Sequence, residues 1–213
     1  MCYTFRMEKL SYQDIREQMC YIAGQIWERR LTNAYGGNFA VRTGDDSFLV
    51  TPSMMAEEKH CQLVPGDLVL VSFDGTVLEG EGRLSRETEM HAALLKAFPT
   101  VGAVIHAHPM NAMVFASAER PIPSVTEATE QQGEAGLAKF APMCTPEMSA
   151  NVLAYYEERR ELTERLPLAC VLPKHGVVVT GKNLNNAFTM LELTETDAYC
   201  ALNRIFLRTK PQQ

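Results

Sequence analysis

The sequence predicts an α/β fold in which helices cover the faces of a mostly antiparallel sheet. Its first half holds short apolar runs separated by turn signals, as antiparallel hairpins require. Its second half alternates helical patterns with strand patterns, so helices are available to cover the sheet. With 213 residues, 46% of them hydrophobic, the chain can bury one good-sized core. Residues 1–213 are therefore expected to form a single domain.

An amphipathic helix and a set of hairpins make up the first half. Residues 11–30 carry apolar side chains at three- and four-residue steps, and Ser11 with Asp14 resembles a capping box at the helix start. After the pair Gly36–Gly37, short strand patterns follow at residues 38–42, 47–52 and 66–80. The last pattern is interrupted by Asp74–Gly75, which is a strong hairpin signal.

Helices and strands alternate from Ser85 onward. Residues 85–98 predict a helix that starts at Ser85 and stops before Pro99. Strand patterns follow at residues 101–108 and on both sides of a turn at residues 173–176. Further helices are expected at residues 111–118, 145–166 and 183–206.

Composition excludes several classes of protein. The formal net charge is -6 and no basic stripe is present, which argues against a nucleic-acid partner. No apolar run reaches the roughly 18 residues that a membrane span needs, so no membrane partner is expected. The first residues lack the apolar core of a signal peptide. The chain has six scattered cysteines: Cys2, Cys20, Cys61, Cys144, Cys170 and Cys200. They form no CxxC pair, which predicts reduced thiols in a cytoplasmic protein.

A pair of histidines, His106 and His108, is the first chemical signal. They lie two residues apart in a predicted strand, although the chain has only five histidines. Alternate side chains of a strand share a face, so both imidazoles project together and can hold one divalent cation. The alternative is a pair of partly buried histidines that neighbouring carbonyl groups satisfy.

Two further groups strengthen the metal hypothesis. Glu87 and His91 lie one helical turn apart in the helix that precedes this strand, so both can face the same side. His175 occupies a tight turn between two strands, where its side chain can be aimed. Three neutral imidazoles and a carboxylate leave an open position on a metal ion, which is the arrangement of catalytic zinc sites.

The order and spacing of several segments resemble the class II aldolase/adducin family. The segments are "YGGNFAVR", "FLVTPS", "PGDLVLVSFDG", "LSRETEMHAALLKAFPTVGAVIHAHP" and "LPKHGVVVTGKNLNNAF". The resemblance extends from about Leu10 to Phe206. It implies a three-layer α/β/α fold and a homotetramer with active sites at subunit interfaces. It also implies one Zn²⁺ per subunit, or another divalent metal.

The resemblance also assigns roles to individual residues. The metal ligands map onto His106, His108 and His175. The catalytic carboxylate maps onto Glu87, and His91 then supports the site without binding the metal. Donors for a substrate phosphate map onto Gly37, Asn38, Ser53 and Ser85, with Arg86 beside them. Without the resemblance, these donors would be read as ordinary turn and cap residues.

Some positions depart from the family pattern. Met54 stands where the family has glycine in a phosphate loop, and Arg86 replaces a second serine. Fuculose-phosphate enzymes have a tyrosine at a position where this chain has approximately Glu127. The tyrosine near their C-terminus has no match in "LRTKPQQ". These departures leave the metal chemistry intact and leave the identity of the substrate open.

The activity that this resemblance implies is zinc-dependent aldol cleavage. A ketose 1-phosphate similar to L-fuculose 1-phosphate would be cleaved reversibly to dihydroxyacetone phosphate and an aldehyde, through a metal-stabilised enediolate. Alternatives are a related sugar-phosphate decarboxylase, dehydratase or 4-epimerase. A non-catalytic adducin-like assembly module is disfavoured by the three histidines and Glu87. Metal binding without catalysis is disfavoured because an open site with a nearby base is poorly suited to storage.

Overall fold

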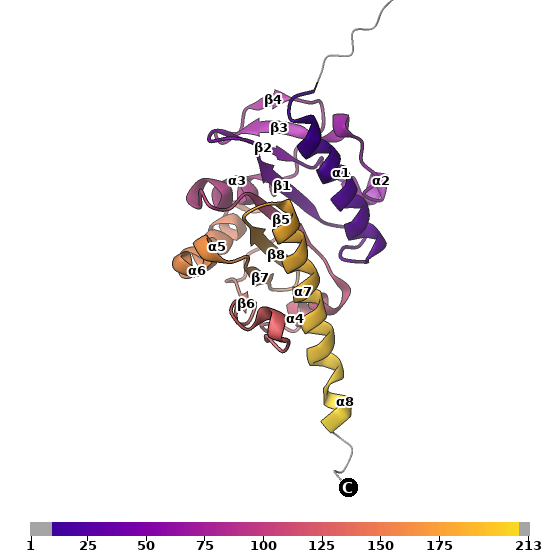
Figure 1. Cartoon of the computed structure of the whole chain (residues 1–213), viewed down its shortest axis with the longest axis vertical. Coiled ribbons are helices and arrows are strands. Elements are labelled where there is room, and N and C mark those ends of the chain that lie inside the picture. The colour runs from indigo at the N-terminus through magenta and orange to yellow at the C-terminus, as the bar shows by residue number, and fades with distance from the viewer. Residues whose placement is uncertain (1–9, 209–213) are drawn as a thin grey trace, which may run out of the picture.

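The computed structural model describes residues 10–208, and one eight-stranded sheet runs through them. The strand order is β4-β3-β2-β1-β5-β8-β7-β6, which places β1, β5 and β8 at the centre (Figure 1). The strands are β1 (Asn38–Arg42), β2 (Ser47–Val50), β3 (Val69–Ser72), β4 (Val77–Glu79), β5 (Ala103–Ala107), β6 (Gly136–Leu137), β7 (Ala169–Leu172) and β8 (Gly176–Gly181).

Helices lie on both faces of the sheet. The α-helices are α1 (Gln13–Glu28), α2 (Met55–Lys59), α3 (Thr88–Ala97), α4 (Met110–Ser117), α5 (Pro146–Glu157), α6 (Arg160–Arg165), α7 (Leu184–Asn203) and α8 (Ile205–Arg208). Two short 3₁₀ helices are η1 (Pro65–Asp67) and η2 (Glu127–Thr129). Among the described residues, no helix is both long enough and apolar enough to cross a bilayer.

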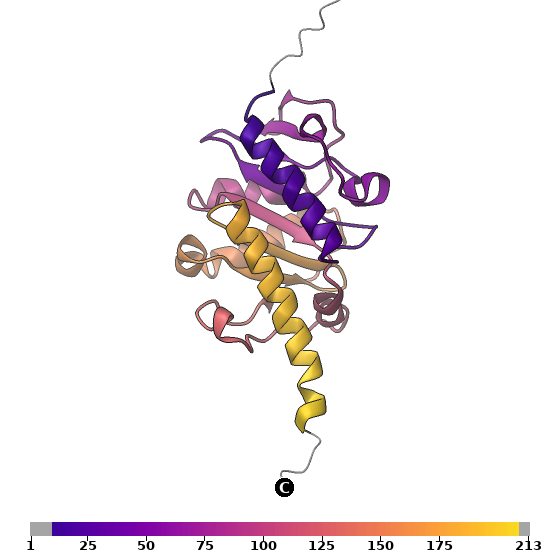
Figure 2. The ribbon, with the colours of Figure 1, turned by 45° about the vertical axis from the view of Figure 1, so that its right-hand side comes forward.

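Two apolar clusters show how the three layers form. Alternate side chains of a strand point to opposite faces, and β5 illustrates this. Ile105 packs in the cluster that contains the buried side chains of α1, α4 and α7. Val104 packs in the second cluster, with the buried side chains of α3 and α5. Figures 1 and 2 show α1 and α7 together over one face of the sheet. The expected three-layer α/β/α arrangement is therefore present.

The sheet is mixed, which corrects the expectation of a mostly antiparallel sheet. Six neighbouring pairs are antiparallel, but β6 pairs parallel with β7 at the edge. The parallel strand β6 spans only two residues, Gly136–Leu137. A run of two residues is too short to show an alternating pattern, so β6 could not be predicted from the sequence.

Most predicted boundaries agree with the structure, and the turn at Asp74–Gly75 joins β3 to β4 as expected. Four predictions were wrong. The helix expected to start at Ser85 begins at Thr88, and the helix expected over residues 183–206 is interrupted at Arg204, between α7 and α8. Ser11 does not cap α1; its backbone N–H donates to Glu79 (3.1 Å), and the cap residue is Tyr12 in the left-handed region. The helix expected over residues 145–166 is two helices, because the backbone of Arg159 leaves the α region between them.

Candidate metal centre and active site

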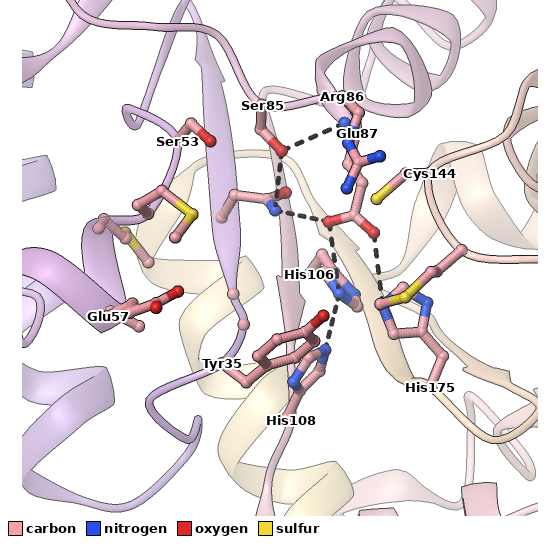
Figure 3. Close-up of a pocket in the computed structure, with 17 residues that line it drawn as sticks. Tyr35, Ser53, Glu57, Ser85, Arg86, Glu87, His106, His108, Cys144 and His175 are labelled. Carbon is pink, nitrogen blue, oxygen red and sulfur yellow. Dashed lines mark hydrogen bonds and ion pairs between the residues drawn. The ribbon is translucent and has the colours of Figure 1, made fainter.

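The three predicted metal ligands lie together at the centre of the sheet. His106 is on β5, His108 follows the same strand, and His175 lies in the turn that joins β7 to β8. Each offers one ring nitrogen as a ligand, and these nitrogens lie within 4.8 Å of one another. Figure 3 shows the three imidazole rings converging below the carboxylate of Glu87. His106 and His108 are buried, and His175 is nearly so.

Hydrogen bonds fix which nitrogens of His106 and His108 are free for a metal. Nδ1 of His106 lies 3.0 Å from the carbonyl oxygen of Val177, which can only accept, so Nδ1 carries the proton. Nδ1 of His108 lies 3.3 Å from Oδ1 of Asn33, an oxygen that also accepts from the backbone N–H of Tyr35. In the neutral rings, each Nε2 therefore presents a lone pair.

The two lone pairs face each other, with the Nε2 atoms of His106 and His108 3.1 Å apart. Two acceptors at this distance repel unless a proton or a cation lies between them. Tetrahedral zinc with Zn–N bonds of about 2.0–2.1 Å holds two ligand atoms about 3.3 Å apart. The donor set and its spacing therefore fit a zinc ion.

Glycines give His108 the space it needs. A Cβ atom on Gly36 would lie 1.9 Å from Cε1 of His108. A Cβ atom on Gly176 would lie 2.6 Å from Cδ2 of His108 and 2.6 Å from the carbonyl oxygen of Ala107. Any side chain at either position would displace the imidazole, so both glycines are required by the packing of the histidine cluster.

Glu87 is the only carboxylate of the described pocket residues that approaches these imidazoles. Its Oε1 lies 3.4 Å from Nε2 of His175, and its Oε2 lies 3.6 Å from Nε2 of His106. Glu87 is 5% exposed, and its Oε1 has no hydrogen-bond partner within the described part of the chain. One carboxylate oxygen is therefore left to face an incoming ligand.

The environment of Glu87 favours its ionised form. Burial alone would raise its pKa, but a charge on His106, the hydrogen bond from Asn38 and the charges on His175 and His91 lower it. Together they hold the pKa of Glu87 at about 2, below its ordinary value of 4.5. A cation bound by the imidazoles would also lower the pKa of Glu87, as a positive charge on His106 does.

The imidazoles of His91, His108 and His175 are held in their neutral form. Burial, followed by the charge of His106, lowers the pKa of His91 and of His108 to about 3, and lowers the pKa of His175 to about 4. Glu87 opposes this shift in each case. A neutral imidazole is the form that binds a metal ion, so the site is prepared for one near neutral pH.

All of the residues predicted for the site line one cavity of about 290 Å³. Besides the three histidines and Glu87, the structure brings together there Gly37, Asn38, Ser53, Ser85 and Arg86. In Figure 3, Ser53, Ser85 and Arg86 lie on the side of the cavity away from His108. The hydroxyl of Ser85 accepts from the backbone N–H of Glu87 (3.2 Å), and Arg86 is exposed.

The structure also adds residues that the sequence did not point to. The cavity is also lined by Tyr35, Gly36, Met55, Ala56, Glu57, Met143 and Cys144, and by Met54, which stands in place of the family glycine. Met143 and Cys144 come from a loop far along the chain, and no sequence pattern connects that loop to β5. Glu127 begins η2, is exposed and does not line the cavity.

Five of the six cysteines lie in the described part of the chain, and these five are free thiols. Cys2 lies outside the described residues. Cys144 lies close to Glu87 and Arg86 (Figure 3). Burial, then the charge of Glu87, raises the pKa of its thiol, so Cys144 is protonated in this site.

Comparison with known proteins assigns the family. Residues 17–202 match the family described as Class II Aldolase and Adducin N-terminal domain. The chain is 31% identical over 178 residues to a 5-methylthioribulose-1-phosphate/5-deoxyribulose-1-phosphate aldolase of Rhodospirillum rubrum, which covers 83% of this chain and 75% of that protein. It is 26% identical over 201 residues to a methylthioribulose-1-phosphate dehydratase of Acidiphilium cryptum, with 90% and 91% covered.

A solved structure extends this likeness to three dimensions. An L-fuculose 1-phosphate aldolase superposes with a TM-score of 0.80 at 27% identity, over 95% of this chain and 91% of that one. A second, L-fuculose-1-phosphate aldolase from Thermus thermophilus, has a TM-score of 0.75 at 24% identity and shows the shared fold. With nearly the whole chain matched in sequence and in fold, this protein belongs to the class II aldolase and adducin family.

Proposed function

We propose that this protein is a metal-dependent lyase that cleaves a ketose 1-phosphate to dihydroxyacetone phosphate and an aldehyde. The observation that carries the proposal is the cluster of three imidazoles with the carboxylate of Glu87 3.4 Å from His175, inside one cavity. We propose Zn²⁺ as the metal because nitrogen donors in this geometry suit zinc. We also propose that the protein is cytoplasmic and forms a homotetramer, in which residues of a neighbouring subunit complete each active site.

The proposed chemistry divides between the metal and the chain. When bound by the three imidazoles, a divalent ion supplies Lewis-acid polarisation of the substrate carbonyl. During cleavage, Glu87 takes the proton of the substrate hydroxyl whose carbon becomes the aldehyde. After the carbon–carbon bond breaks, it gives that proton to the carbon next to the carbonyl, and the reverse reaction moves the proton back. The low pKa of Glu87 keeps it ionised near neutral pH, as a base must be.

The phosphate is proposed to bind at the polar end of the cavity. Gly37, Ser53 and Ser85 offer backbone or side-chain donors there, and the guanidinium of Arg86 adds a positive charge. Arg86 is exposed at the cavity, and none of the described ion pairs uses it. A planar guanidinium suits the bidentate recognition of phosphate.

The apolar wall of the cavity favours a substrate with an apolar end. Tyr35, Met54 and Met143 line the cavity and are 74%, 36% and 43% exposed. Such side chains suit a terminal methyl or methylthio group better than a hydroxyl group. L-Fuculose 1-phosphate, 5-deoxyribulose 1-phosphate and 5-methylthioribulose 1-phosphate all end in such a group.

Dehydration of methylthioribulose 1-phosphate is the second candidate reaction. The relative from Acidiphilium cryptum carries that name, and the same base next to the same carbonyl can start a loss of water. In dehydration, Glu87 would remove the proton at the carbon next to the carbonyl, and the neighbouring hydroxyl would leave as water. The two reactions therefore share their base and differ in the bond that breaks.

The deciding experiment compares products over a matched panel of sugars. Zinc-loaded protein receives L-fuculose, ribulose, 5-deoxyribulose or 5-methylthioribulose 1-phosphate. A coupled dehydrogenase follows dihydroxyacetone phosphate, and mass spectrometry follows loss of water. Chelator-sensitive release of dihydroxyacetone phosphate from a methyl- or methylthio-ended sugar supports the proposal. Loss of water alone favours the dehydratase, and turnover of none of the four contradicts both.

A further inference from the structure

A buried chain of hydrogen bonds connects His91 to Glu87 through the amide of Asn38. Nε2 of His91 lies 2.5 Å from Oδ1 of Asn38, and Nδ2 of Asn38 lies 2.6 Å from Oε2 of Glu87. The exposed fractions of His91, Asn38 and Glu87 are 0%, 6% and 5%. Three buried polar side chains are thus connected, and two of them, Asn38 and Glu87, also line the cavity.

The chemistry of the groups fixes the direction of each bond. An ionised carboxylate can only accept, so the NH₂ group of Asn38 must face Glu87 and its Oδ1 must face His91. That oxygen also only accepts, so Nε2 of His91 must carry a proton. The neutral ring then has a lone pair on Nδ1, which has no partner among the described residues. His91 is therefore a donor to Asn38 and is not a metal ligand.

Two elements hold this chain: both of its ends, His91 and Glu87, belong to α3, and its middle residue, Asn38, belongs to β1. Asn38 begins β1 and is paired in register with His106 on β5, so its backbone is fixed beside a proposed metal ligand. His91 lies on α3, one turn after Glu87. The Asn38 amide also reaches the hydroxyl of Ser85 at 3.5 Å. If the donor on His91 were removed, the Asn38 amide could rotate and turn its oxygen toward Glu87, where two acceptors would repel.

We propose that His91 is a positioning residue that holds Glu87 in its reactive orientation through Asn38. This inference rests on the proposed function, in which Glu87 transfers the proton. It also gives Asn38 a task different from the expected one, because the NH₂ group of Asn38 is engaged by Glu87 and not free for the phosphate. Partners that orient a reactive group in this way typically change activity by about 10- to 100-fold when they are removed.

Two substitutions separate positioning from packing. His91→Met removes the N–H donor and keeps an apolar side chain of similar length, whereas His91→Gln keeps an N–H group near the position of Nε2. We expect His91→Met to lower kcat about 10- to 100-fold, with zinc content and KM unchanged. His91→Gln should recover most of the lost kcat. Equal losses in both variants, or full kcat in His91→Met, would overturn the proposal.

Two measurements decide the proposal even if no sugar phosphate is turned over. In the zinc-loaded protein, NMR of ¹⁵N-labelled histidine should find the His91 proton on Nε2 and in slow exchange with water; a proton on Nδ1 contradicts the chain of bonds. In a crystal structure of zinc-loaded His91→Met, the Glu87 carboxylate should leave its place beside Asn38. An unmoved carboxylate contradicts positioning, whereas inactivity of the unaltered protein contradicts only the proposed function.

Discussion

The Nε2 atoms of His106 and His108 lie 3.1 Å apart, and both present lone pairs when the rings are neutral. A bound cation removes the repulsion between the two lone pairs, so both residues should be needed to hold the cation. His106→Ala should lower bound zinc and turnover in parallel, because two imidazoles cannot hold the ion as three can. Elemental analysis and a product assay measure both quantities.

His60 provides the matched control for that variant. It is exposed and stacks on Trp27, with ring centroids 5.1 Å apart, away from the cavity. His60→Ala should keep the metal content and turnover of the unaltered protein. Equal zinc in His106→Ala and His60→Ala would mean that the three imidazoles do not form the metal site.

Glu87→Gln should lose turnover while the metal stays bound. The amide keeps the size of the side chain and cannot accept the proton, and a general base typically contributes about 10²- to 10⁴-fold to rate. Glu89→Gln, on the exposed side of the same helix, is the control. Steady-state kinetics with zinc analysis tests the pair, and full turnover in Glu87→Gln would show that another group is the base.

Arg86→Gln should raise KM for the phosphorylated sugar by at least about 10-fold, because a charge-assisted contact to phosphate contributes roughly 1.5–3 kcal/mol. The metal content should not change, since Arg86 lies outside the histidine cluster. KM for the unphosphorylated sugar should be the same in Arg86→Gln and in the unaltered protein. An unchanged KM for the phosphorylated sugar would remove Arg86 from the phosphate site.

Met54→Ser should reduce the preference for sugars with a methyl or methylthio end. One lost apolar contact in a pocket typically changes discrimination by about 10- to 200-fold. The ratio of kcat/KM for 5-deoxyribulose 1-phosphate to that for ribulose 1-phosphate measures the effect. A ratio that stays constant in Met54→Ser and in Met143→Ser would mean that the apolar wall does not contact the end of the substrate.

The buried imidazoles should make the metal-free protein sensitive to mild acid. The pKa values of His91, His108 and His175 fall from 6.5 in the unfolded chain to about 3, 3 and 4 in the folded chain. Below pH 6.5 the unfolded state therefore binds more protons, and stability present above that pH is lost as pH falls toward 4. Each such histidine contributes a slope of up to about 1.4 kcal/mol per pH unit.

Urea unfolding of chelator-treated protein between pH 7 and pH 5 measures this slope. His91→Gln removes one of the three histidines and should make the dependence shallower, whereas His60→Ala should leave it unchanged. A free energy of unfolding that is constant across this range would mean that the histidines are not held neutral.

Local patterns explain why much of this site could be predicted from the sequence. The period of two in a strand brings His106 and His108 to one side. The turn signal before Gly176 puts His175 in a turn, but it is the family resemblance that assigned His175 and the phosphate donors to the same site. What could not be predicted depends on contacts between distant segments. No local pattern relates Asn38 to His91, or brings Met143 and Cys144 to the wall of the cavity.

The same distinction explains the errors in the fold. The two-residue strand β6 forms only because β7 lies beside it, so its parallel pairing has no sequence signature. Next to the break at Arg159, the guanidinium of Arg160 lies 4.6 Å from the ring centroid of Phe98, a contact with a distant segment that no local pattern predicts. The capping prediction at Ser11 failed because the carboxylate of Glu79, far along the chain, takes its N–H group.

Titration of the metal-free protein with zinc tests the central claim most directly. Turnover of the preferred ketose 1-phosphate should rise in proportion to added zinc, stop at one equivalent per chain, and disappear again on chelation. His106→Ala should show no such rise. Full turnover in chelator-treated protein, or a protein that binds no zinc with its three histidines intact, would contradict the account.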